Sequence, residues 1–223
     1  MKKFILLALS CLLTVGAQAQ IVSSRSVSVT REAKAPSETM QYLYVQWNPG
    51  SFNVEGDSNL SYNGFSIGYN KAISISSSTP LFIEAGIGLQ YTYHSKNYED
   101  YDEDYKETLS LVSLKVPVSL VYNYAIPNSD ISLAPYAGIY LRGNVIGKLK
   151  EIYEDEDENE SYNIFSDDDV DNTCKRFQIG WHVGVNAKFN DKYLVGVSYG
   201  ADLSNLIEGC KTSQASVTLG IIF

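Results

Sequence analysis

The stretch that decides the fold is residues 212–223, TSQASVTLGIIF. Successive side chains of a β-strand point to opposite faces of the sheet, so residues two apart share a face. One face of this stretch is apolar and carries Ala215, Val217, Leu219, Ile221 and Phe223. The other face is small or polar and carries Gln214, Ser216, Thr218 and Gly220. The pattern predicts a strand with one apolar and one polar face, which ends on an aromatic residue.

The same alternation recurs along the chain, and helical periodicity fits none of these stretches well. The clearest case lies between Phe177 and Phe189, where every second residue is apolar. Eight strands are expected, over residues 40–48, 61–73, 81–94, 108–124, 131–147, 175–189, 192–203 and 213–223. The sequence therefore predicts an all-β fold.

Glycines decide which face of each strand points inward. Ten of them share the polar faces: Gly64, Gly68, Gly86, Gly88, Gly138, Gly180, Gly184, Gly196, Gly200 and Gly220. Glycine weakens a strand, so its repetition on one face needs a packing reason. The interior of an eight-stranded barrel is just wide enough for side chains, and small residues there make room for large ones. We expect four inward tyrosines to lie across these glycines: Tyr42, Tyr44, Tyr136 and Tyr140.

The apolar faces then point outward, which is the reverse of a soluble lipocalin-like barrel. Lipid suits such an outer surface better than water does. The predicted fold is an eight-stranded antiparallel up-and-down transmembrane β-barrel, and a soluble periplasmic barrel is the alternative.

The beginning of the chain has the features of a secretory signal peptide. Lys2 and Lys3 precede an apolar run, and Ala17-Gln18-Ala19 form a small-residue cleavage site. The expected organisation is a signal peptide at 1–19, a periplasmic leader at 20–39 and a barrel at 40–223. Beyond the signal peptide two cysteines are left, Cys174 and Cys210, which could form a disulfide in an oxidising compartment.

Two neighbouring segments carry a family resemblance. Residues 113–124, SLKVPVSLVYNY, place Pro117 inside a strand, and residues 133–141, LAPYAGIYL, contain Pro135, Tyr136 and Gly138. This pairing resembles the outer-membrane β-barrel domain family common in Bacteroidetes, including small OmpX-like, OmpA-like and PorT-like barrels. A final strand that ends on Phe is likewise similar to the C-terminal strand of outer-membrane barrels. Proline removes a ladder donor, so Pro117 predicts a bulge.

The resemblance implies an integral protein of the outer membrane of a Gram-negative bacterium. With an even number of strands, both termini would lie in the periplasm. We expect a monomer in contact with outer-membrane lipid and lipopolysaccharide.

Charged and titratable residues fall on the inward faces of the predicted strands: Glu84, Lys115, Arg142, His182, Lys188 and Asp202. Unpaired charges inside a filled barrel are costly, so these side chains are expected to pair in a network that plugs the lumen. A gated ion path is the alternative.

Two predicted extracellular loops, 97–107 and 151–172, hold 17 of the 26 acidic residues of the chain. Their simplest interpretation is a pair of solvated, self-repelling loops. One alternative is capture of Ca²⁺, with the alternating Asp167, Asp169 and Asp171 as candidate ligands, although the glycine turn of an EF-hand is missing. Another is an extracellular protein partner that contacts the loop tyrosines: Tyr98, Tyr101, Tyr105, Tyr153 and Tyr162. The formal net charge of −9 disfavours nucleic acid and anionic surfaces as partners.

The chain has no phosphate loop, zinc-ligand spacing or dinucleotide motif. The only crude pair of base and nucleophile is His94 with Ser95, and neighbours on a strand point to opposite faces. We therefore expect no enzymatic activity and no cofactor. The expected role is structural or surface interaction, by a barrel with a filled polar lumen. A small channel or transporter and an outer-membrane lipid-modifying enzyme are the alternatives.

Overall fold

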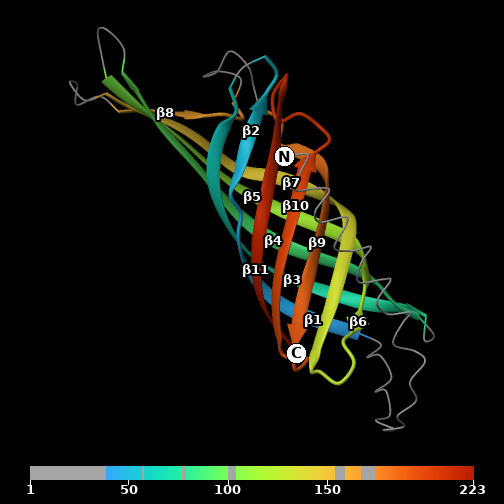
Figure 1. Ribbon diagram of the computed structural model, residues 1–223. Helices are drawn as coiled ribbons and strands as arrows, with labels where there is room; N and C mark the ends of the chain where they lie inside the picture. The colour runs from blue at the N-terminus through green and yellow to red at the C-terminus, as the bar shows by residue number, and fades with distance from the viewer. Residues whose placement is uncertain (1–38, 57, 77–78, 100–103, 154–158, 167–173) are drawn as a thin grey trace. The chain divides into compact units, whose positions relative to one another are not determined.

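The computed structural model describes residues 39–56, 58–76, 79–99, 104–153, 159–166 and 174–223, and these form β-strands and no helix (Figure 1). The strands are β1 (Thr39–Trp47), β2 (Gly50–Val54), β3 (Leu60–Ser76), β4 (Thr79–Glu99), β5 (Asp104–Tyr122), β6 (Tyr124–Ala125), β7 (Ile131–Tyr153), β8 (Asn159–Asn163), β9 (Phe177–Phe189), β10 (Tyr193–Asp202) and β11 (Cys210–Ile222). Within these ranges no helix exists that is long and apolar enough to span a membrane.

Eight of the strands close into a ring in the order β1-β3-β4-β5-β7-β9-β10-β11, and every neighbouring pair is antiparallel. The ring closes at β1, where Tyr42 lies opposite Ile222 of β11 on one side and Asn70 of β3 on the other. Closure leaves the ring without an edge strand. The eight predicted strands and the barrel are confirmed. The three short strands extend it: β2 continues β1, β6 continues β5, and β8 pairs with β7.

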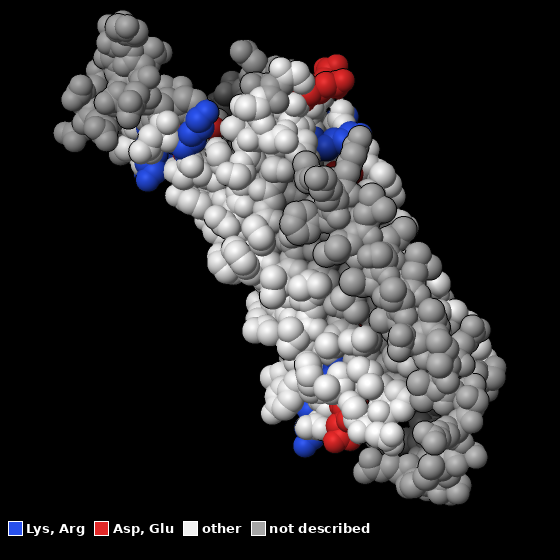
Figure 2. Space-filling model, viewed as in Figure 1, with Lys and Arg blue, Asp and Glu red and all other residues white. Residues whose placement is uncertain are grey.

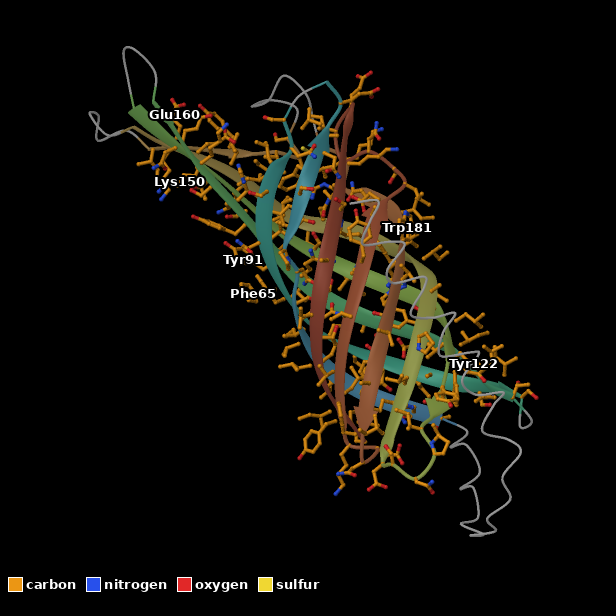
Figure 3. All side chains as sticks on the ribbon, viewed as in Figure 1. Phe65, Tyr91, Tyr122, Lys150, Glu160 and Trp181 are labelled. Carbon is orange, nitrogen blue, oxygen red and sulfur yellow. The ribbon has the colours of Figure 1, made fainter. Side chains whose placement is uncertain are left out.

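The barrel has an apolar outer surface and a polar interior, as predicted. Leu43, Ile67 and Leu219 are each more than half exposed, whereas Gln90 and Gln178 are almost completely buried. Phe65, Tyr122 and Trp181 project from the outer wall (Figure 3). On the face of Figure 2, the described charged side chains gather towards the two ends of the barrel.

Four of the ten inward glycines closely approach tyrosine side chains, which confirms the predicted packing for Tyr44, Tyr136 and Tyr140, whereas a Cβ atom at Gly220 would lie at an ordinary contact distance from Tyr42, 3.5 Å. A Cβ atom at Gly180 would overlap the ring of Tyr140, and one at Gly88 would overlap the hydroxyl of Tyr44. Tyr136 lies in the same way against Gly184. These close approaches require glycine because any side chain would displace an aromatic ring of the interior.

The predicted bulge at Pro117 is wrong. Pro117 lies opposite Tyr140 of β7, and the pairing of β5 with β4 keeps the same register on both sides of the proline. The missing donor therefore leaves a gap in the ladder and no extra residue. A bulge occurs instead at Val145 of β7, because Val112 pairs with Ile146 while Ser113 pairs with Asn144. Val145 and Ile146 are consequently both exposed, at 57% and 49%.

The prediction that residues 97–107 form a long loop is also wrong. β4 continues to Glu99 and β5 begins at Asp104, so most of this segment is a hairpin. In the second segment, β7 reaches Tyr153 and residues 159–163 form β8. Cross-strand pairing extends these strands, because each polar residue keeps a partner on the next strand.

Candidate functional site

Within the part of the chain that the structure describes, the interior contains one ion pair, between Arg142 and Asp202, surrounded by hydrogen bonds. The Asp202 side chain is wholly buried and that of Arg142 is 7% exposed. Arg142 also donates to the hydroxyl of Thr212 at 2.9 Å, and the Tyr140 hydroxyl donates to Asp202 at 2.7 Å. Four side chains from three strands, β7, β10 and β11, thus tie the barrel wall together near one end.

The other predicted interior charges lie inside the barrel but bind neutral partners. Glu84 accepts from the Tyr42 hydroxyl at 2.8 Å and from the Asn70 amide at 2.9 Å. Lys115 lies 4.0 Å from the centroid of the Tyr140 ring. The remaining two contacts are His182 Nε2 to Ser119 Oγ at 2.9 Å and Lys188 Nζ to Met40 Sδ at 3.6 Å. Among the described residues the expected salt-bridge network is therefore limited to Arg142 and Asp202. Tyrosine, amide, hydroxyl and thioether groups contact the other interior charges, and Glu84 Oε2 is buried without a hydrogen-bond partner.

The barrel interior is filled along the residues that the structure describes. A cavity beside Glu84, Lys115 and His182 has a volume of about 40 Å³, and one beside Arg142 has about 10 Å³. One water occupies about 30 Å³ of the liquid, so the larger cavity holds one or two waters. A hydrophobic cluster next to Arg142 closes the barrel on one side of this residue. The cluster consists of Phe52, Tyr62, Leu111, Ile164, Leu206 and Cys210.

Cys174 and Cys210 both lie in or against this cluster. Cys210 is buried in it and Cys174 packs against it. Both are free thiols in the structure, so the predicted disulfide is not formed there. Burial, followed by the proximity of Cys210, raises the pKa of the Cys174 thiol to about 11.

A four-stranded extension rises beyond the ring and is the most distinctive feature of the molecule. The last pair of β3 with β4 is Asn63 with Tyr93, and the last pair of β9 with β7 is Phe177 with Gly143. Beyond these rows, residues 95–99 of β4, 104–110 of β5, 147–153 of β7 and the whole of β8 pair only with residues of these same four strands, among the described strands. We call these residues the protruding sheet, which lies at the upper left of Figure 1.

One face of the protruding sheet, the carboxylate face, is acidic. A single row across its four strands consists of one lysine and three glutamates: Lys96, Glu107, Glu151 and Glu160. Like charges directly opposite each other on adjacent strands repel. Burial, and then the charge of Glu151, raises the pKa of the Glu107 carboxyl.

The opposite face, the lysine face, carries three lysines, with Glu99 and Asp104 in its outermost described row. Lys106, Lys148 and Lys150 are exposed on it, and Lys148 and Lys150 lie two residues apart on β7. Lys150 and Glu160, from the two faces, are labelled in Figure 3. Sequence reasoning missed this face, because the extra residue at Val145 reverses the alternation that precedes it. The consecutive apolar pair Val145-Ile146 is the signal that could have revealed it.

Several predicted site residues do not come together in the described structure. Asp167, Asp169 and Asp171 lie outside the described residues, so their Ca²⁺ site stays a prediction. Elsewhere in the described ranges no cluster of three or more metal-binding side chains occurs. His94 is buried with Nδ1 against the Ser61 carbonyl, whereas the Ser95 hydroxyl meets Thr108 at 3.4 Å, so these neighbours do not form a catalytic pair.

Comparison with known proteins identifies the family. The family described as outer membrane protein beta-barrel domain matches residues 5–223. No curated protein matches the chain. Among solved structures, Ail, the attachment invasion locus protein of Yersinia pestis, is 13% identical, with 84% of this chain and 100% of that chain covered and a TM-score of 0.47. Neisserial surface protein A is 14% identical (81% and 96% covered, TM-score 0.41), and the outer membrane enzyme PagL is 18% identical (80% and 98% covered, TM-score 0.43). The chain thus belongs to the outer membrane protein beta-barrel domain family, as an integral protein of the Gram-negative outer membrane.

Proposed function

We propose that this protein is a monomeric surface-interaction protein whose binding element is the protruding sheet, turned to the outside of the cell. The observation that carries the proposal is the protruding sheet itself, which extends beyond the ring and places Glu107, Glu151 and Glu160 in one row of one face. The opposite end, where Gln41 and Phe223 share a backbone hydrogen bond of 3.0 Å, then faces the periplasm. Short turns at that end and longer extensions at the other are typical of transmembrane barrels.

The filled interior favours a surface role over a channel. The 40 Å³ and 10 Å³ cavities leave no room for a solute larger than water. The hydrophobic cluster lies between them and the protruding end. We expect the protein to give almost no conductance in planar bilayers, and a steady open-channel current would favour the channel alternative.

The carboxylate face is suited to a partner with a basic surface. Three glutamates stand in adjacent positions on three strands. The two segments to which they belong carry 17 of the 26 acids of the chain. Complementary charge raises the association rate and excludes partners of the same sign. The partner class we propose is therefore a cationic extracellular protein or peptide.

Orientation is tested by labelling intact cells with a membrane-impermeant maleimide. Asn97→Cys, in the protruding sheet, and Lys192→Cys, at the other end, are each made with Cys174→Ser and Cys210→Ser. We expect labelling of the first variant only, and labelling of Lys192→Cys alone would reverse the orientation.

Binding is tested with a fluorescent decalysine peptide and the barrel in nanodiscs. Glu107→Gln, Glu151→Gln and Glu160→Gln together should weaken a salt-sensitive association, since they remove three charges from one face. The matched control neutralises Glu55, Asp130 and Glu208, which are exposed elsewhere. Equal loss in both triple variants would show that net charge, and not the carboxylate face, attracts the peptide.

Calorimetry with Ca²⁺ on the full chain tests the candidate ligands Asp167, Asp169 and Asp171.

A further inference from the structure

The lysine face continues the apolar outer surface of the barrel without a break. Tyr91, Val112 and Ile146 form the last outward row that contains apolar residues on all three strands. Lys148 lies two residues beyond Ile146 on the same face, and Lys150 two residues further. Each step of two residues advances about 7 Å along a strand, so the lysines begin within one lipid headgroup of the apolar surface.

The rows of Lys148 and Lys150 carry no acid, whereas Glu99 and Asp104 pair with each other on this face in the row beyond Lys106. The neighbours of Lys150 in its row are hydroxyl residues, Thr108 on β5 and Ser161 on β8. Those of Lys148 are Ser110 and Asn163. Lys148 and Lys150 therefore stand among hydroxyl and amide groups, a surrounding that accepts anionic oxygen atoms.

A hollow lies at the base of this face, between β7 and β8. It has a volume of about 330 Å³, and its lining includes Val145, Lys148 and Asn163. Arg176 stands beside it: Nη1 donates to the Val145 carbonyl at 3.4 Å, and the guanidinium lies 4.6 Å from the ring centroid of Phe165. A fixed guanidinium next to a lysine is a recurrent arrangement for a phosphate group.

We propose that the lysine face, with Arg176 at its base, binds the phosphate groups of the outer-leaflet lipids that surround the barrel. In the orientation proposed above, the ligand is the phosphorylated glycolipid lipid A. The apolar wall below meets the acyl chains, while Lys106, Lys148 and Lys150 meet the charged headgroups. The carboxylate face then points away from this anionic layer. The net charge of −9 argues against anionic partners only for the protein as a whole, because Lys148 and Lys150 lie on the face opposite Glu107, Glu151 and Glu160.

The test is native mass spectrometry of the full-length mature barrel in detergent, titrated with lipid A that carries its phosphates. The variant combines Lys106→Gln, Lys148→Gln and Lys150→Gln. The matched control combines Lys71→Gln, Lys96→Gln and Lys192→Gln, which removes the same charge from other positions. Each lysine near a charged lipid surface contributes about a factor of five, so the variant should bind lipid A on the order of 100-fold more weakly than wild type. The control should stay within about a factor of three.

Three further measurements make the result decisive. Heat-modifiable migration in gels should be unchanged in both triple variants, because all six lysines are outside the buried interior. Dephosphorylated lipid A should bind wild type and variant equally, whereas the same loss with this probe would overturn the role of phosphate. Inorganic phosphate at millimolar concentration should not displace lipid A, and full displacement would indicate a phosphate-ion site. Equal binding by the variant and the control would also overturn the proposal, and none of these results depends on which end faces outside.

Discussion

Replacement of Arg142 by Ala should lower the stability of the barrel more than any other single loss of an interior charge. The substitution leaves the Asp202 carboxylate, which is wholly buried, without its cation. Removal of one partner of a buried ion pair typically costs about 3–5 kcal/mol. Asp202 keeps two donors, the hydroxyls of Tyr140 at 2.7 Å and Thr212 at 2.5 Å, so we expect the lower end, about 3 kcal/mol.

Lys115 is the one interior cation that could replace the lost guanidinium. It lies directly opposite Arg142 on β5, and its ammonium is over the Tyr140 ring. The substitution is therefore measured twice, alone and together with Lys115→Met. The second variant should lose at least as much stability relative to Lys115→Met as the first loses relative to wild type.

The assay is reversible unfolding in guanidinium chloride in detergent, followed by tryptophan fluorescence of Trp47 and Trp181. The double variant Arg142→Met/Asp202→Leu serves as the control, because it removes both partners and leaves neither of them as an unpaired buried charge. It should be less destabilised than the sum of the two single changes, by roughly 2–3 kcal/mol. A loss below about 1 kcal/mol for Arg142→Ala in both backgrounds would refute a buried, stabilising ion pair.

Two further predictions concern the interior packing and the protruding sheet. Gly180→Ala should destabilise the barrel by about 1–3 kcal/mol, because its methyl group would displace the Tyr140 ring. The control Gly143→Ala should be nearly neutral, because its methyl group would only touch Phe177 at 3.4 Å. Equal effects of the two substitutions in guanidinium unfolding would contradict the tight fit at Gly180. Since the pKa of Glu107 is raised above 4.5, the folded sheet binds this proton more tightly than the unfolded chain, so its extra stability is present below about pH 4.5 and is lost as the pH rises through the raised pKa. Hydrogen exchange of β5 and β7, corrected for intrinsic rates, should then show more protection at pH 4 than at pH 7 in wild type and a smaller difference in Glu107→Gln.

The barrel could be predicted from the sequence because two independent patterns agree. The alternation over Phe177–Phe189 predicts the strand. The inward Gly180 and Gly184 predict a narrow barrel, because they leave the space that Tyr140 and Tyr136 fill. Both patterns are local, and a closed ring lets every strand turn its apolar face outward and its glycine-bearing face inward. The charged residues lie in the interior because they alternate with the outward apolar residues in the same way.

The protruding sheet could not be predicted in the same way. The segments that contain Glu107 and Glu151 have the composition of solvated loops. Only the pairing of these residues with the next strand makes them part of a sheet. Pro117 and Val145 show the same limit. A proline can leave a gap without changing the register, whereas an ordinary valine can carry the bulge, and the partner strand decides which occurs. The interior partners were missed because Lys115 contacts the Tyr140 ring and Glu84 accepts from the Tyr42 hydroxyl, which charge pairing alone does not suggest.

The single inserted residue at Val145 acts as a parity switch for everything above it on β7. If it were deleted, Lys148 and Lys150 would turn towards the barrel axis and Glu151 would turn towards the membrane, with no change in net charge. The gain or loss of one codon could thus exchange the faces of the β7 charges, while Lys106 and Glu107 on β5 keep theirs and the barrel beneath stays intact.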